Sequence, residues 1–210
     1  MHNSTVATGQ VLGYIKLVAE EMLNLKDLPI YINFDSDWFC FPPHVESGLL
    51  KVALYGWGYT RTDSTERGLS TPPITPGHIR ANFVPEDGVA RLLAGLREVL
   101  PAFAHRELDR VADCWYSDTP SGDFIIDHYP EHGNLFIAMG GGGKKSSAFK
   151  FLPILGKYVV QGLTGSLPLH LAEKWIFRTE YKDVDDSFRG DGSRGGSERR
   201  DFTAQEKARL

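Results

Sequence analysis

Several features that mark large protein classes are scarce in this sequence of 210 residues. The two cysteines, Cys40 and Cys114, are too few for a disulfide framework and lack the paired spacing of a zinc site. No stretch approaches the roughly 20 apolar residues that a membrane-spanning helix needs, and residues 1–5 do not begin a secretory signal. We therefore expect a soluble, non-secreted protein with no metal site and no membrane partner.

A concentration of charge of one sign is also missing. The formal net charge is −4, and the basic residues are scattered along the chain rather than gathered into a stripe. Proteins that bind nucleic acids concentrate Lys and Arg on one surface to neutralise phosphates. The sequence therefore predicts no nucleic-acid partner.

The composition is that of a globular protein, with 41% hydrophobic and 24% charged residues. Residues 8–25 predict an apolar strand followed by a short acidic helix. Residues 29–59 are rich in aromatic and β-branched residues interrupted by turn residues, which is typical of short antiparallel strands. A long loop is expected over 60–81, and the apolar periodicity of 85–100 predicts an amphipathic helix.

The second half of the chain continues this mixture of strands and helices. Residues 111–116, 124–126 and 135–139 predict further strands, and a second helix is expected over 149–163. After about residue 178 the chain becomes a Gly, Ser, Arg and Asp mixture that predicts a disordered tail. Strands and two helices without a repeating order favour an α+β fold.

The strongest local signal is a strand, a glycine run and a helix. The predicted strand 135–139 leads directly into Gly140 to Gly143, and the helix follows a few residues later. Glycines permit close approach of a ligand to the backbone, and the free amides at a helix start favour negative charge. A phosphate or the anionic pyrimidine end of a reduced flavin would suit such a site, and a flexible turn without a ligand is the alternative.

Several short motifs follow one another in a fixed order: Ala7–Gln10, Ile30–Phe34, Phe39–Pro42, Leu50–Lys51, Asp113–Pro120, Gly122–Asp127, Gly140–Gly143 and Phe149–Pro153. In content and in order these motifs resemble the sarcosine, pipecolate and fructosyl amino acid oxidases, and fungal members in particular. The resemblance covers about residues 7–178. It is a resemblance to the carboxy-terminal part of a FAD-dependent amine oxidase.

The resemblance implies a set of cofactor-binding residues. Cys114 matches the cysteine that forms a thioether to the flavin ring, a reaction that needs a thiolate beside an electron-poor methyl group. Gly140, Gly141 and Phe149 match positions that lie against FAD. An inert buried thiol is the alternative for Cys114. Cys40 matches no reactive position, so we expect it in the core.

The resemblance also implies catalytic and substrate-binding residues. Lys51 matches the lysine that activates dioxygen through its fixed positive charge, although an exposed strand lysine is the alternative. Lys150 matches the lysine that pairs with the substrate carboxylate, and its place in the first turn of a helix is electrostatically unfavourable without such a role. Tyr116 matches a tyrosine that borders the substrate and shares in catalysis, with a plain core position as the alternative.

By the same resemblance the chain divides into three parts. Residues 8–113 would be the second half of a substrate domain, 114–178 the carboxy-terminal segment of a Rossmann-like FAD-binding domain, and 179–210 the disordered tail. The strand-to-helix G-x-G-x-x-G fingerprint of the family's amino-terminal half is missing. The loop 142–147 is about three residues longer than in the family and lacks its frequent histidine, so it departs from the family's pattern.

The function implied by the resemblance is oxidation of the C–N bond of a secondary-amine amino acid by dioxygen, giving an imine and hydrogen peroxide. The alternative is a truncated, inactive fragment that acts at most as a binding module. Without the pyrophosphate-binding fingerprint, we expect the isolated chain to bind FAD weakly or not at all. The ending Ala208-Arg209-Leu210 resembles the peroxisomal Ser-Lys-Leu address, which predicts an import receptor as partner and a peroxisomal location, with a cytoplasmic location as the alternative.

Overall fold

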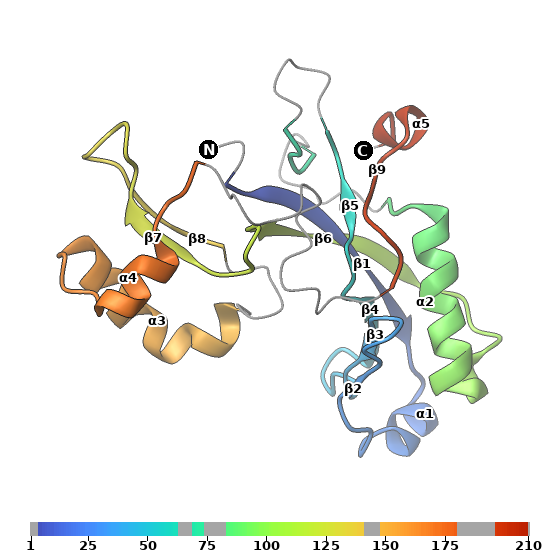
Figure 1. Cartoon of the computed structure of the whole chain (residues 1–210). Coiled ribbons are helices and arrows are strands. Elements are labelled where there is room, and N and C mark those ends of the chain that lie inside the picture. Colours follow the sequence, from blue (N-terminus) through green and yellow to red (C-terminus); the bar gives the residue numbers. More distant parts are fainter. Residues whose placement is uncertain (1–3, 63–68, 74–82, 141–147, 180–195, 210) are drawn as a thin grey trace. The chain divides into compact units, whose positions relative to one another are not determined.

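The computed structural model describes residues 4–62, 69–73, 83–140, 148–179 and 196–209. The chain divides into two compact units (Figure 1). The sheet unit comprises residues 8–62, 71–115 and 194–210, and the hairpin unit comprises residues 1–7, 63–70 and 116–193. Each unit has its own hydrophobic clusters.

The sheet unit is built on one curled, largely antiparallel sheet. Within the described residues its strands follow the order β2-β3-β4-β1-β5-β9, and β6 also pairs with β1. The central strand β1 runs antiparallel to β4, with Tyr14 opposite Lys51 and Leu12 opposite Ala53. The strands are β1 (Val6–Lys16), β2 (Tyr31–Ile32), β3 (Trp38–Cys40), β4 (Leu49–Leu54), β5 (Tyr59–Thr60), β6 (Arg110–Asp118) and β9 (Arg200–Asp201).

Helix α2 (Glu86–Val99) covers one face of this sheet. Val11 and Ile15 on β1 and Val52 on β4 are buried in one cluster with Leu92 and Leu96 of the helix. Alternate residues of a strand point to the same face, so these positions define the core side of the sheet. Two shorter helices, α1 (Ala19–Asn24) and η2 (Pro101–Phe103), belong to the same unit.

The packing of α2 against the sheet is very close at Trp38, which is 1% exposed. The indole N–H of Trp38 donates a hydrogen bond to the carbonyl of Leu92 at 3.0 Å. A β-carbon at Gly95 would lie only 2.2 Å from the Trp38 ring. Glycine at this position lets the helix lie directly on the indole.

The hairpin unit is a two-stranded antiparallel sheet with helices packed on it. Strand β7 (Ile125–His128) pairs with β8 (Phe136–Met139), and α3 (Ala148–Leu163) and α4 (Leu169–Trp175) follow. Phe124, Ile126 and Trp175 form the buried centre of the cluster that α3 joins.

The structure confirms the predicted α+β class with an antiparallel-rich sheet. The helices expected over 85–100 and 149–163 occur as α2 and α3, and three predicted strands occur as β6, β7 and β8. Helix α4 was not predicted. Most of the loop expected over 60–81 lies outside the described residues.

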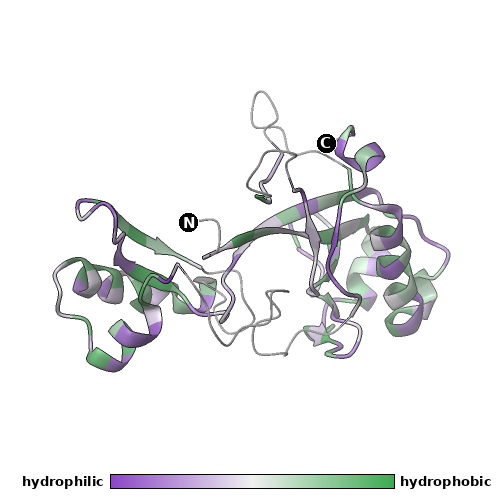
Figure 2. Cartoon of the chain, turned by 45° about the horizontal axis from the view of Figure 1, so that its top comes forward, coloured by the Kyte–Doolittle hydropathy of each residue, from purple (hydrophilic) through white to green (hydrophobic). Residues whose placement is uncertain are grey.

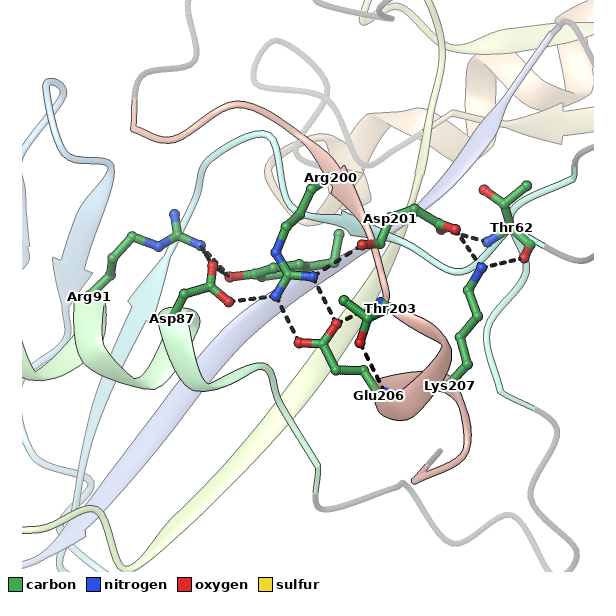
Figure 3. Close-up of polar contacts among 9 residues, drawn as sticks. Thr62, Asp87, Arg91, Arg200, Asp201, Thr203, Glu206 and Lys207 are labelled. Carbon is green, nitrogen blue, oxygen red and sulfur yellow. Dashed lines mark hydrogen bonds and ion pairs between the residues drawn. The ribbon is translucent and has the colours of Figure 1, made fainter.

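The expectation of a disordered tail does not hold for residues 196–209, which form β9 and α5 (Ala204–Lys207) on the sheet unit (Figure 3). Phe202 is 2% exposed and its ring stacks on Tyr59. The Arg200 guanidinium donates to both carboxylate oxygens of Glu206 at 2.8 Å and to Asp87 at 2.5 Å. One apolar anchor and one charged network order a segment whose average composition is polar.

The predicted division after residue 113 lies close to the boundary between the units at Trp115 and Tyr116. The assignment of the units to a substrate domain and a FAD-binding domain stays a prediction. None of the described helices has the length and apolar character needed to cross a membrane.

Candidate cofactor and active site

The face of the sheet turned away from α2 carries two of the predicted site residues. On β4, Leu50 and Val52 point into the core shared with α2, so Lys51 and Ala53 point to the opposite face. Across the pairing, Tyr14 lies opposite Lys51. We call this second side of the sheet the open face.

Cys114 reaches the open face from another strand, β6. Leu12, Ala53 and Ala112 form a small buried cluster on this face, and Cys114 packs against it. Tyr14 packs against the same cluster. The structure therefore brings Lys51 and Cys114, which are far apart in the sequence, to one face of one sheet.

Lys51 is half-buried, and its ammonium lies 5.5 Å from the centre of the Phe41 ring. None of the described residues gives its Nζ atom a hydrogen bond or an ion pair. Lys51 and Phe41 belong to the lining of a hollow of about 680 Å³ beneath the loop that joins β3 to β4. A cation held near an aromatic ring and free of an acidic partner is available to an anion or to developing negative charge.

The two cysteines have different environments, as the sequence predicted. Cys40 is fully buried, and this burial raises the pKa of its thiol. Cys114 is a free thiol and is partly exposed. Only Cys114 combines access with a position on the open face, and the core position of Cys40 is confirmed.

Asp113, the neighbour of Cys114, points to the opposite side of β6 and is 7% exposed. Neither of its carboxylate oxygens has a hydrogen-bond partner among the described residues. Its Cγ lies 3.5 Å from where a β-carbon at Gly9 would be. Burial raises the pKa of this carboxyl to about 7. Sequence reasoning missed Asp113, although an acid at a core position of a strand was a visible signal.

Tyr116 lies two residues beyond Cys114 in β6 and is half-buried. Residues two apart in a strand point to the same side, so Tyr116 leaves the strand on the side of Cys114. The boundary between the units falls between Trp115 and Tyr116. Its role beside the substrate stays a prediction.

Gly140 directly follows β8 and has a backbone conformation that favours glycine. Its φ is +92°, and a β-carbon would lie 2.8 Å from the carbonyl oxygen of Asp123 and 3.0 Å from a carbon of Thr119. The backbone therefore passes very close to its neighbours at the start of the glycine run. Gly141 and the long loop 142–147 lie outside the described residues.

Phe149 and Lys150 occupy the first turn of α3. Both side chains are exposed, Phe149 to 83%. No described residue forms an ion pair with Lys150, so its ammonium is available to a carboxylate. Both residues belong to the hairpin unit, and their convergence with Lys51 and Cys114 stays a prediction.

Two other kinds of cofactor signature give no site. Within the described ranges, no group of three His, Cys, Asp or Glu side chains could hold a metal ion. Gly190, Gly192 and Gly195 have the G-x-G-x-x-G spacing. They lie in a polar run outside the described residues, and no apolar strand pattern precedes them.

Comparison with curated proteins places the chain among amine and amino acid oxidases. It is 33% identical over 182 residues to L-saccharopine oxidase of Schizosaccharomyces pombe, an alignment that covers 84% of this chain and 40% of that protein. It is 29% identical over 156 residues to a monomeric sarcosine oxidase of a Bacillus species, with 72% of this chain and 35% of that protein covered. No family model matches the chain.

Solved structures show the same relationship. The fold matches a fructosamine oxidase of Aspergillus fumigatus, Amadoriase II, with a TM-score of 0.82 and 27% sequence identity. The match covers 96% of this chain and 46% of that structure. The chain thus spans less than half the length of the relatives that it matches.

Proposed function

The chain belongs to the sarcosine and fructosyl amino acid oxidase family, and from this membership we propose that it supplies the carboxy-terminal part of a FAD-dependent amine oxidase. The substrate is a secondary-amine amino acid, oxidised at the C–N bond by dioxygen. The products are an imine and hydrogen peroxide. Sarcosine, pipecolate, saccharopine and glycated amino acids all present the required secondary amine beside a carboxylate.

One observation carries this proposal: Lys51 and Cys114 share the open face of the sheet. An alternating strand places a residue on the wrong face as often as on the right one. Two residues with independent roles at one flavin must lie on the same face. The pairing of Tyr14 with Lys51 and the packing of Cys114 on Leu12 and Ala53 meet this condition.

The residues present fit a flavin. Cys114 offers a partly exposed thiol for the thioether. The Lys51 ammonium, which has no ion-pair partner among the described residues, would offer a fixed positive charge near the flavin ring. By the resemblance, Gly140 and Gly141 would lie against the cofactor, and Phe149 would pack against it. Bound FAD would accept the hydride equivalent from the amine and pass its electrons to dioxygen.

The protein's own groups have three tasks in this scheme. Lys51 lowers the cost of placing negative charge on dioxygen, because no acidic side chain among the described residues neutralises its ammonium. Lys150 pairs with the substrate carboxylate and so orients the carbon next to nitrogen. Tyr116 borders the substrate from the strand that carries Cys114.

The second candidate function is an inactive fragment that acts as a binding module. The observation in its favour is coverage, since the match spans only 40% of the saccharopine oxidase. The fingerprint that binds the FAD pyrophosphate belongs to the part not spanned. The isolated chain is therefore expected to retain little or no flavin.

The test joins the chain, in one reading frame, behind the part of the S. pombe enzyme that it does not match. Peroxide release from the four kinds of secondary-amine substrate is then measured. We expect activity with at least one of them, and Lys51→Met to lower it about 100-fold or more, as for loss of a group that stabilises developing charge. The control is Lys26→Met, a lysine exposed near Asp27. No peroxide from any substrate favours the inactive fragment.

A peroxisomal location is part of the same proposal and rests on Ala208-Arg209-Leu210. Ala208 and Arg209 are both exposed, although the Arg209 guanidinium lies 4.2 Å from the centre of the Phe83 ring. A peroxide-forming enzyme benefits from a compartment that contains catalase. Fluorescent fusions with and without the final triplet, observed in fungal cells, separate this location from a cytoplasmic one.

A further inference from the structure

The hollow beneath the loop that joins β3 to β4 is larger than the proposed chemistry at Lys51 requires. Its volume of about 680 Å³ lies within the range of pockets that hold drug-sized ligands, about 300–1,000 Å³. A water molecule in the liquid occupies about 30 Å³, so the hollow has room for far more than dioxygen. Much of it is therefore available to another part of the substrate.

The hollow adjoins the part of the open face that carries Cys114. Tyr14 lines the hollow and also packs on the small buried cluster that Cys114 joins. Phe41 lines the hollow too, and its ring meets the ring of Phe39 edge to face, with 5.6 Å between the ring centres. Phe39 packs on the same cluster as Cys114. A group bound in the hollow would therefore lie next to whatever the open face binds.

The walls of the hollow are mainly apolar. Their apolar side chains are Ile30, Phe41, Pro42, Pro43, Val45 and Leu49. Apolar colouring occurs on the strands and on the helices of the sheet unit (Figure 2), where the main cluster is buried between α2 and the sheet. Val45, in contrast, is 85% exposed and Ile30 is 59% exposed. Exposed apolar residues that gather around one hollow mark a surface that binds an apolar group.

The turn that presents Val45 is held by its own hydrogen bonds. The His44 N–H donates to the carbonyl of Leu49 at 2.9 Å, and the Gly48 N–H donates to the carbonyl of His44 at 2.8 Å. The Ser47 N–H donates to Nδ1 of His44 at 3.2 Å. Val45 belongs to no apolar cluster among the described residues of the sheet unit. The turn is thus a preformed wall whose apolar residue does not contribute to the core.

Lys51 limits the chemical character of the group that the hollow can take. A carboxylate in the hollow would pair with the Lys51 ammonium and neutralise the charge that dioxygen activation needs, whereas a cationic group would be repelled by it. An uncharged polar group would lose hydrogen bonds to water against the apolar walls. Glu46, the acid in the lining, is exposed to solvent. An apolar group meets none of these costs, and its burial is favourable.

We propose that the hollow holds an apolar side chain of the amino acid substrate, and that Val45 and Ile30 determine the preference for it. The inference rests on the proposed function, in which the secondary amine and the neighbouring carbon lie at the flavin on the open face. The substrate class is then an N-alkyl amino acid with an aromatic or branched aliphatic side chain, for example N-methyl-L-phenylalanine. Sarcosine has no side chain and leaves the hollow empty, whereas saccharopine places an acidic arm beside Lys51.

The first measurement uses the fused protein, in which the chain follows the part of the S. pombe enzyme that it does not match. The value of kcat/KM for peroxide release is determined with N-methyl-L-phenylalanine, sarcosine and L-saccharopine. The decisive quantity is the ratio of kcat/KM for N-methyl-L-phenylalanine to that for sarcosine. A ratio is used because a new carboxylate near Lys51 lowers the turnover of every substrate.

The variants Val45→Asp and Ile30→Asp each place a carboxylate on one wall of the hollow. Both residues are exposed, so the core of the sheet unit stays intact. We expect each variant to lower the ratio by about tenfold or more, since burial of one large apolar side chain contributes at least that factor. Val18→Asp is the matched control, because Val18 is 60% exposed in the same unit and does not line the hollow. It should leave the ratio within about twofold.

The second measurement requires no flavin chemistry. The unmodified chain is titrated with N-methyl-L-phenylalanine and, separately, with sarcosine, and the backbone amide resonances of residues 44–51 are followed by NMR. We expect N-methyl-L-phenylalanine to shift these resonances and sarcosine to leave them in place. Val45→Asp should weaken the apparent affinity for N-methyl-L-phenylalanine by about tenfold.

Three results would overturn the inference. They are oxidation of sarcosine or saccharopine without oxidation of N-methyl-L-phenylalanine, a substrate ratio that Val45→Asp leaves unchanged, and loop resonances that respond equally to both ligands or to neither. Absence of peroxide from every substrate counts against the proposed oxidase function instead, and the titration of the unmodified chain then decides whether the hollow binds an apolar side chain.

Discussion

The two long helices, α2 and α3, differ in how completely their apolar residues are buried within their own units. Helix α2 buries Leu92 and Leu96 completely against the sheet and fits Gly95 onto the Trp38 ring. Helix α3 also packs one side on its unit, but it leaves a second apolar row in contact with solvent. Within the described residues, the sheet unit buries the apolar side of its main helix, whereas the hairpin unit leaves one apolar row of α3 exposed.

The largest expected effect concerns Asp113, a buried carboxyl whose two oxygens have no hydrogen-bond partner among the described residues. Burial raises the pKa of Asp113 from the ordinary 3.8 to about 7, so the folded unit favours the protonated carboxyl. The protonated form of Asp113 therefore contributes its full share to the free energy of unfolding below about pH 4, and this contribution is lost as pH rises through about 7. At 1.36 kcal/mol per pH unit the loss is about 4 kcal/mol. Urea unfolding at several pH values measures this loss.

Asp113→Asn removes the ionisation, so the variant should lose far less stability between pH 4 and pH 8 than the parent. The exposed Asp27 provides the control Asp27→Asn, which should leave the parent's pH dependence unchanged. A parent whose unfolding free energy does not fall over this range would show that Asp113 has a partner in solution.

A substitution at Gly95 tests whether α2 packs on Trp38 as closely as the structure indicates. Gly95→Ala places a methyl group 2.2 Å from the indole, and overpacking of this kind costs about 1–3 kcal/mol. The loss should exceed the gain from replacing a helical glycine. Urea unfolding followed through the Trp38 indole N–H resonance measures it, and an unchanged or raised midpoint contradicts the packing.

Loss of the contacts that hold residues 196–209 on the sheet unit should have a smaller effect on stability. Arg200 holds the pKa of Glu206 down at about 2, so the attachment of α5 is present above about pH 4.5 and is lost as pH falls through 2. Arg200→Ala should release the segment and cost about 1–2 kcal/mol, because it removes charge-assisted hydrogen bonds to Asp87 and Glu206 (Figure 3). Hydrogen exchange of the amides of residues 200–208 should rise in the variant, while that of α2 should not.

Replacing Gly156 by alanine should have the smallest effect on stability, and it should stabilise the protein, whereas Gly95→Ala should destabilise it. Since nothing lies within 4 Å of its added methyl group, Gly156→Ala should stabilise the hairpin unit by about 0.5–1 kcal/mol. A destabilised hairpin unit in thermal unfolding of the isolated chain would mean that the outer side of α3 is already covered.

The sequence was sufficient where structure depends on local pattern. The three- and four-residue periodicity of α2 and α3 is visible in the chain because each helix buries one side in its own unit. The tail was misread because its composition is polar on average, whereas its order depends on Phe202 and on the Thr203 and Glu206 capping box.

The candidate site was only partly predictable. The motifs gave Lys51 and Cys114, but their common face depends on the register between β1 and β4 and on the pairing of β6, which no local pattern fixes. Asp113 begins the motif Asp113–Pro120, but it received no role, because the side of the sheet that it takes depends on the pairing of β6 with β1. The exposed row of α3 was hidden because an apolar helix has the same appearance in sequence whether or not its second side is covered.

The identity of the atom that holds the flavin tests the central claim most directly. The fused protein carrying the dinucleotide-binding half is precipitated with acid, digested, and its flavin-containing peptide is identified by mass spectrometry. The account predicts one flavin on the peptide that contains Cys114, and none in Cys114→Ala, while Cys40→Ala keeps it. Flavin on the Cys40 peptide, or on a peptide from another part of the fusion, contradicts the assignment of the open face to the cofactor.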